Sequence, residues 1–169
     1  VPTVLCGQLE GHPYRDVFST VYSDDEEGGR FAALAMKERG RKDIVAVLGP
    51  QDNHAVVDRL RGYRTVLGED LPGANVIYTG WNSGDGYQAM HQILARELAF
   101  DGVLCGSDRI AAGVITALNE AGLSVPADVS VVGFDDHEIA ARCVPALTTV
   151  RQPLREEGHM AANIALDMI

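Results

Sequence analysis

The chain has 169 residues, of which 46% are hydrophobic and 22% charged, a composition typical of a globular protein. Acidic residues outnumber basic ones by 24 to 14, and a net charge of -10 argues against a phosphate-binding surface for DNA or RNA on these residues. The sequence shows neither a signal peptide nor an apolar run near the roughly 20 residues of a membrane helix. The three cysteines, Cys6, Cys105 and Cys143, form no CxxC pair, which favours a reducing compartment such as the cytoplasm.

The first part of the chain predicts two short strands followed by a helix. The strands are expected at 2–6 and 17–22, where apolar residues are concentrated. A helix is expected over 28–39, because its apolar residues share one face and Gly40 follows it.

Short apolar runs alternate with helical patterns along the middle of the chain. Such runs are typical of parallel strands that are buried on both faces. The strands are predicted at 44–48, 75–79, 102–105 and 129–134, and apolar residues at helical spacing predict helices around 57–67, 90–98 and 110–118. A further strand at 147–150 and a helix over 154–168 follow. The alternation predicts an α/β fold with a doubly wound parallel sheet.

Polar residues follow four of the predicted strands. In an open α/β sheet, ligands bind outside the carboxyl ends of the strands, so these segments are expected to converge. A carboxylate and an arginine form paired hydrogen bonds with vicinal hydroxyls, and a tryptophan offers a flat face to a ring. The pattern therefore predicts a pocket for a small polar molecule, lined by segments 49–53 with Asn53, 80–83 with Trp81, 106–108 with Ser107, and 135–137 with Asp135, together with Arg59.

Each of these residues also has a purely structural interpretation. Asp135 and Asp136 could form a solvated turn, and Ser107 could serve only to cap a helix. Arg59 could lie on a helix surface, and Trp81 could pack on a neighbouring helix. The functional interpretation depends on the convergence of all the segments at one edge of the sheet.

Signatures of catalysis are weak, and we predict neither an enzyme, a cofactor nor a metal site. The sequence contains no HExxH, GxGxxG, GxxxxGK[ST] or GxSxG motif in the required context. The acidic run at 24–27 is interpreted as a complement to a helix dipole. Cys105 ends a predicted strand but has no partner at a recognised spacing, and we interpret it as a small buried residue.

The sequence of segment 122–152, GLSVPADVSVVGFDDHEIAARCVPALTTVRQ, strongly resembles the LacI/GalR family of bacterial transcription regulators. Members carry G-L-x-V-P-x-D-V-S-V-V-G-F-D-D followed by P-x-L-T-T-V-x-Q-P. The resemblance covers roughly 17–169 and includes further matching segments: SDDEEGGRFAAL, RLRGYRTVL, SGDGYQAM and LCGSDRIAAGVITALNEAG. One departure is Gly40-Arg41-Lys42, where many members carry Gly-His.

The resemblance implies a periplasmic-binding-protein-like fold of type I with an incomplete second lobe. Residues 1–39 and 151–169 are expected in a partial N-terminal lobe, and residues 40–150 in a C-terminal effector-binding lobe. A helix-turn-helix headpiece, a hinge and part of the N-terminal lobe are expected to lie outside this sequence. Apolar faces of the terminal segments are therefore expected to lack part of their packing partners.

The resemblance also implies roles for individual residues. Arg59 matches the effector-binding arginine of the R-x-x-G-[FYW] motif, Trp81 an aromatic that stacks on the ligand, and Asp135 the effector-binding acid. Ser107 and Gln152 match positions where some members use a polar ligand.

The function expected from this resemblance is effector binding in a cytoplasmic transcriptional regulator. A small polar metabolite, in the first place a sugar, is expected to bind between the lobes and to control DNA binding by the headpieces of a homodimer. A periplasmic sugar-binding protein of an ABC transporter is the alternative with the same fold, and an enzyme on a doubly wound sheet is a further one.

Overall fold

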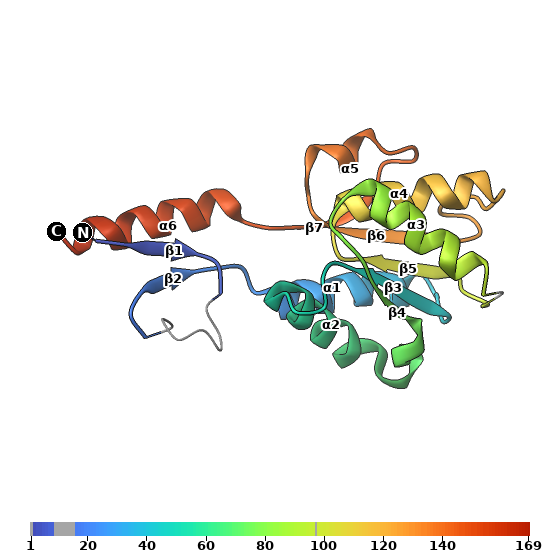
Figure 1. Ribbon diagram of the computed structural model, residues 1–169, viewed down its shortest axis with the longest axis horizontal. Helices are drawn as coiled ribbons and strands as arrows, with labels where there is room; N and C mark the ends of the chain where they lie inside the picture. Colours follow the sequence, from blue (N-terminus) through green and yellow to red (C-terminus); the bar gives the residue numbers. More distant parts are fainter. Residues whose placement is uncertain (1, 9–15, 97) are drawn as a thin grey trace. The chain divides into compact units, whose positions relative to one another are not determined.

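The computed structural model describes residues 2–8, 16–96 and 98–169 (Figure 1). Contacts divide the chain into two compact units, of which unit 1 comprises residues 1–24 and 152–169 and unit 2 comprises residues 25–151. None of the described helices is both long enough and apolar enough to cross a membrane.

Unit 1 contains two parallel strands and a helix. Strands β1 (Val4–Cys6) and β2 (Ser19–Val21) pair in register, and helix α6 (Leu154–Asp167) contacts both of them. These elements confirm the predicted terminal strands and final helix. No residue of α6 is buried, and Leu154 and Leu166 are each more than 60% exposed, so apolar side chains of this helix lie in solvent.

Unit 2 is built on a parallel sheet of five strands. Its strand order is β4-β3-β5-β6-β7, and every neighbouring pair is parallel. In chain order within the unit this is 2-1-3-4-5, the order of a flavodoxin-like doubly wound sheet. The predicted fold class is therefore confirmed. The strands are β3 (Ile44–Leu48), β4 (Val76–Tyr78), β5 (Gly102–Cys105), β6 (Ser130–Asp135) and β7 (Thr148–Arg151).

Helices cover both faces of this sheet, with α1 and α2 on one side and α3 and α4 on the other (Figure 1). The short helix α5 leaves no helical period in the sequence, because five residues are too few to show one. The helices are α1 (Asp25–Glu38), α2 (His54–Leu67), α3 (Ser83–Leu94), α4 (Asp108–Glu120) and α5 (Glu138–Arg142), and two 3-10 turns, Gly68–Asp70 and Gly73–Asn75, lie between α2 and β4.

Helix α1 belongs to unit 2, whereas the sequence analysis grouped residues 1–39 with the terminal segments. The reason is its packing, since Ala32 and Met36 of α1 are buried in the same apolar cluster as Leu60 of α2. The helix also begins at Asp25, earlier than predicted, because the acidic residues form its first turn and complement the helix dipole there. The contacts place the unit boundaries after residues 24 and 151. The lobe bounds of 1–39, 40–150 and 151–169 remain a prediction.

The buried strands explain why the sheet is so readily recognised from sequence. Side chains alternate along β3, with Val45 and Val47 in the cluster beneath α3 and α4, and Ile44, Ala46 and Leu48 in the cluster beneath α1 and α2. Because both faces are covered, all five positions are apolar and buried.

Helices α3 and α4 pack closely through glycines. A Cβ atom built on Gly86 would lie 2.2 Å from the Ile110 carbonyl oxygen, and one on Gly113 would lie 1.9 Å from that of Ser83. These distances show that the two backbones meet with no space for a side chain.

This packing makes a testable prediction about Gly86. We expect Gly86→Ala to lower the free energy of unfolding by about 1–3 kcal/mol, because overpacking outweighs the gain in helix propensity. Gly84 is the matched control in the same helix, since a Cβ there meets nothing within 4 Å. Gly84→Ala should raise stability by roughly 0.5–1 kcal/mol. Urea unfolding of both variants measures the difference, and equal stability of the two would contradict close packing.

Candidate functional site

The carboxyl ends of β4, β3, β5 and β6 lie side by side, because these strands are parallel neighbours. The predicted convergence of the polar segments that follow them is therefore confirmed. The strand order reverses between β3 and β5, which is the switch point where open α/β sheets bind ligands.

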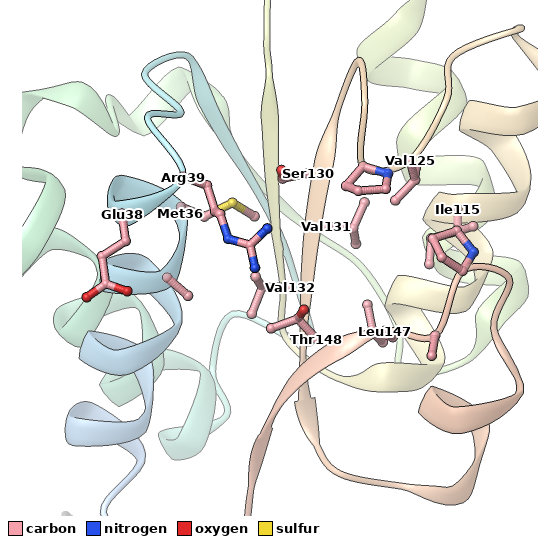
Figure 2. A pocket seen from close by; sticks show the side chains of 14 residues that line it. Met36, Glu38, Arg39, Ile115, Val125, Ser130, Val131, Val132, Leu147 and Thr148 are labelled. Carbon is pink, nitrogen blue, oxygen red and sulfur yellow. The ribbon is translucent and has the colours of Figure 1, made fainter.

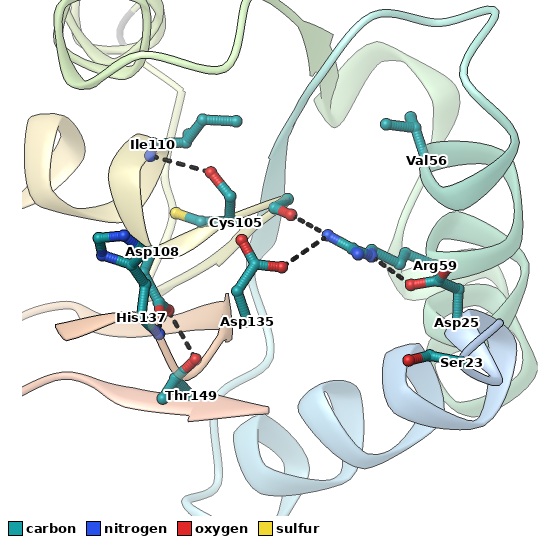
Figure 3. Close-up of polar contacts among 12 residues, drawn as sticks. Ser23, Asp25, Val56, Arg59, Cys105, Asp108, Ile110, Asp135, His137 and Thr149 are labelled. Atoms are coloured by element: carbon teal, nitrogen blue, oxygen red, sulfur yellow. Dashed lines mark hydrogen bonds and ion pairs between the residues drawn. The ribbon is translucent and has the colours of Figure 1, made fainter. Parts of the chain in front are cut away.

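Arg59 of α2 lies at this switch point and is only 4% exposed. Its Nε donates to Asp25 Oδ1 at 2.8 Å, and its Nη1 donates to the carbonyl oxygen of Gly106, which follows β5. The same Nη1 lies 3.5 Å from Asp135 Oδ1 (Figure 3). The guanidinium carbon lies 3.7 Å from the centre of the Phe134 ring. The interpretation of Arg59 as a surface residue is therefore wrong.

These contacts explain how a guanidinium can be buried at this position. A buried charge is tolerated when opposite charges and hydrogen-bond acceptors satisfy it, and Arg59 has two carboxylates and one carbonyl around it. The ring of Phe134 adds a cation–π contact. The role of Asp25 was missed, because the sequence analysis attributed the whole acidic run to the helix dipole.

Asp135 ends strand β6 and has an unusual backbone. Its φ is 107° and that of Asp136 is 55°, a region that non-glycine residues enter only at a cost in energy. The Asp135 side chain is 33% exposed and faces Arg59 (Figure 3). Asp135 is thus the last residue of β6, and Asp136 connects it to His137, the N-cap of α5. The pair also places one carboxylate at the switch point.

Trp81 follows β4 and lies against the end of β3. A Cβ atom on Gly49 would come within 2.5 Å of the indole atoms Cη2 and Cζ2, so the ring rests on the Gly49 backbone. The side chain is half-buried and contacts the apolar clusters on both faces of the sheet. Trp81 therefore packs on the core while part of it remains exposed at the carboxyl edge.

Ser107 and Asn53 act as helix caps, which confirms the structural interpretation of Ser107. Ser107 Oγ accepts a hydrogen bond from the Ile110 amide at 3.2 Å, and Asn53 Oδ1 accepts one from the Val56 amide at 3.4 Å. Ser107 is buried and Asn53 is exposed. Gln152 belongs to unit 1, and its predicted contribution to the site remains a prediction.

The Cys105 thiol at the end of β5 is not available as a nucleophile. Burial raises the pKa of the Cys105 thiol, which keeps it protonated and unreactive. Among residues 2–8, 16–96 and 98–169, no three His, Cys, Asp or Glu side chains are grouped as metal ligands. The Asp135 carboxylate, by contrast, is partly exposed and can accept hydrogen bonds from a ligand.

A separate pocket of about 230 Å³ lies at the opposite, amino-terminal end of β6 (Figure 2). None of the predicted effector-binding residues lines it. Its wall is largely apolar, and the hydroxyl of Ser130 accepts a hydrogen bond from Arg41 Nε at 2.9 Å. This pocket therefore lacks the convergent polar groups found at the switch point. Its lining includes Met36, Arg39, Ile115, Val131 and Leu147.

Comparisons with known proteins agree with this geometry. Residues 33–169 match the family model of the periplasmic binding protein-like domain. The chain is 38% identical to the HTH-type transcriptional repressor PurR of Pectobacterium atrosepticum, and the match covers 99% of this chain and 54% of that protein.

Two solved structures are similar over most of the chain. The transcriptional regulator CelR in complex with cellobiose is 35% identical, with a TM-score of 0.91 over 99% of this chain and 52% of that one. A LacI family regulator of Enterococcus faecalis with bound ribose is 31% identical, with a TM-score of 0.82 over 89% of this chain and 54% of that one. The chain thus spans about half the length of the relatives it matches.

Proposed function

Because the chain belongs to the periplasmic-binding-protein-like family, as an effector-binding domain of the LacI/GalR type, we propose that it binds a small sugar at the switch point of unit 2. The observation that carries this proposal is the buried Arg59 guanidinium lying 3.5 Å from the partly exposed Asp135 carboxylate. Two similar regulators hold cellobiose and ribose in their structures, which supports a sugar as the ligand class.

The proposed binding mode uses the chemistry of these side chains. The Asp135 carboxylate accepts hydrogen bonds from two neighbouring hydroxyls of the sugar, while the ion pair with Arg59 holds this carboxylate in place. The exposed part of the Trp81 indole packs on the apolar face of the ring. Asn53, Ser107 and Gln152 are proposed as further polar contacts.

The regulatory role is proposed for a protein that joins this domain to DNA-binding headpieces, because the chain spans about half the length of the relatives it matches. We propose that sugar binding biases the equilibrium between two arrangements of a cytoplasmic homodimer and so changes the affinity of its headpieces for operator DNA. The similarity to a repressor over nearly all of this chain supports a regulator over a periplasmic transport protein. Sedimentation at several concentrations tests the dimer.

The sugar proposal can be tested through Trp81, which is the only tryptophan of the chain. Titration with ribose and with cellobiose should produce a saturable change in tryptophan fluorescence for at least one of them, because the indole lies at the site. Trp81→Phe should remove the optical signal while calorimetry still detects weakened binding. If neither method detects saturation with pentoses, hexoses or disaccharides, the ligand is not a sugar.

A further inference from the structure

We propose that Asp108 is a positioning residue of this site, whose carboxylate holds the backbone after Asp135 in the left-handed conformation that directs Asp135 towards Arg59. This role rests on the proposed function of Asp135 as an effector ligand. Asp108 is the first residue of α4, which follows β5 at the switch point, and it is completely buried. Asp108 lies in the predicted site segment 106–108, in which Ser107 was named as the candidate ligand.

Both oxygens of Asp108 are engaged by the segment that carries Asp135 and by the neighbouring strand. Oδ2 accepts a hydrogen bond from the His137 amide at 2.7 Å. Oδ1 accepts one from Thr149 Oγ1 of β7 at 2.6 Å (Figure 3). The same Thr149 oxygen accepts a hydrogen bond from the Asp136 amide at 3.3 Å. The carboxylate therefore fixes the two amides that follow Asp135, one directly and one through Thr149.

The surrounding backbone leaves room for this carboxylate. A Cβ atom on Gly133 would lie 2.2 Å from Asp108 Oδ1, so the glycine in β6 permits the approach. Residues with a positive φ persist when their surroundings determine the conformation from several sides. The clamp by Asp108 and Thr149 supplies this constraint for Asp135 and Asp136, whose φ values are 107° and 55°.

A carboxylate is the group that this arrangement requires. It accepts both hydrogen bonds at once, whereas an asparagine offers one acceptor and turns an NH2 group towards the second donor. Burial raises the pKa of Asp108, although the hydrogen bonds from Thr149 and His137 lower it. The buried negative charge of Asp108 thus disfavours folding, while its hydrogen bonds order the segment 135–137. Such a combination is typical of functional positions.

The titration of Asp108 therefore has a definite sign. A folded-state pKa above the ordinary carboxyl value means that the folded protein binds this proton more tightly. Between the ordinary carboxyl pKa and the higher pKa of the folded state, the contribution of Asp108 to the free energy of unfolding falls as pH rises. Asp108→Asn removes this dependence on pH. The titratable and charged groups around it are Asp136 and His137 after β6, Cys105 of β5, Cys143 after α5 and Arg151 of β7.

Three variants and one control test the proposal. Asp108→Asn weakens the clamp, Asp108→Leu removes it, and Thr149→Val keeps the carboxylate but removes its link to Asp136. Asp101→Asn is the matched control, because Asp101 Oδ1 also accepts two backbone amides, those of Lys42 and Asp43 at 3.0 Å each, at the amino-terminal end of β5.

The first measurement needs no ligand. Amide hydrogen exchange should accelerate at His137 in Asp108→Leu and at Asp136 in Thr149→Val, while the urea midpoint of Asp108→Asn at pH 7 stays equal to that of the wild type or rises.

The second measurement is the affinity for the sugar that the wild type binds. It should fall about ten- to hundred-fold in Asp108→Leu and Thr149→Val, the range of one charge-assisted hydrogen bond. Asp101→Asn should leave this affinity unchanged.

The outcomes separate this inference from the proposed function. Unchanged exchange at Asp136 and His137, or unchanged affinity in variants with accelerated exchange, overturns the positioning role. A wild type that binds no sugar overturns the proposed function instead, and the exchange rates still decide whether the clamp exists. If Asp108→Leu does not fold, Thr149→Val decides the question, because it leaves the buried carboxylate in place.

Discussion

Replacing Arg59 with methionine is expected to lower the free energy of unfolding by about 3–5 kcal/mol and to abolish effector binding. The substitution keeps much of the apolar stem but removes the charge that satisfies Asp25, whose side chain is only 10% exposed. It also removes the hydrogen bond to the Gly106 carbonyl and the ion pair with Asp135. A buried carboxylate that loses its opposite charge is strongly destabilising.

Arg142 of α5 provides the control for this variant. Its side chain is 72% exposed and pairs with Glu138, which is 67% exposed, so Arg142→Met should cost less than about 1 kcal/mol. Combining Arg59→Met with Asp25→Leu should recover part of the lost stability, because the buried carboxylate that faced the guanidinium is then also gone. Urea unfolding measures the stability of the two single variants and the double variant. An equal loss of stability in the two single variants would show that the contacts of Arg59 do not stabilise the fold.

The sheet of unit 2 could be predicted from sequence because burial leaves a clear local pattern. Segment 44–48 is apolar at every position since helices cover both faces of β3. The end of α4 could also be located from the sequence. Gly122 follows the apolar pattern of 110–118 in the sequence, and its φ of 79° and the hydrogen bond from the Leu123 amide to the Leu118 carbonyl at 2.9 Å are those of a glycine cap.

The remaining features depend on tertiary contacts that local patterns do not contain. The amphipathic pattern of α1 predicts an apolar face but not its partner, so the assignment of α1 to unit 2 could not be made. From sequence alone, Asp25 and Asp108 are typical of helix N-termini, where a carboxylate caps the helix or complements its dipole. Only the folded structure shows that they are buried and accept hydrogen bonds from Arg59 and from the His137 amide. The positive φ of Asp135 has no sequence signal, because an aspartate occupies this region only when its surroundings enforce it.

Replacing Asp135 with glycine is expected to weaken effector binding by at least about 100-fold and to change stability little. The lost carboxylate removes two charge-assisted hydrogen bonds to the ligand, each worth about 1.5–3 kcal/mol. On the stability side, relief of backbone strain at φ 107° contributes roughly 1–3 kcal/mol. This relief is offset by the lost ion pair with Arg59 and by the roughly 0.5–1 kcal/mol entropic cost of a glycine. Asp135→Ala keeps the strain, so it should be less stable than Asp135→Gly and equally defective in binding.

Asp136→Gly separates the effect of the carboxylate from that of the backbone. Asp136 also has a positive φ, of 55°, but its carboxylate pairs with the exposed Arg151 at 2.6 Å. This variant should therefore retain effector binding and gain or keep stability, because it loses only a surface ion pair. Calorimetric titration gives the affinities and urea unfolding the stabilities. Wild-type affinity in Asp135→Gly would show that the ligand is held by other groups, whereas a loss as large in Asp136→Gly would show that the shape of the turn, and not the Asp135 carboxylate, determines binding.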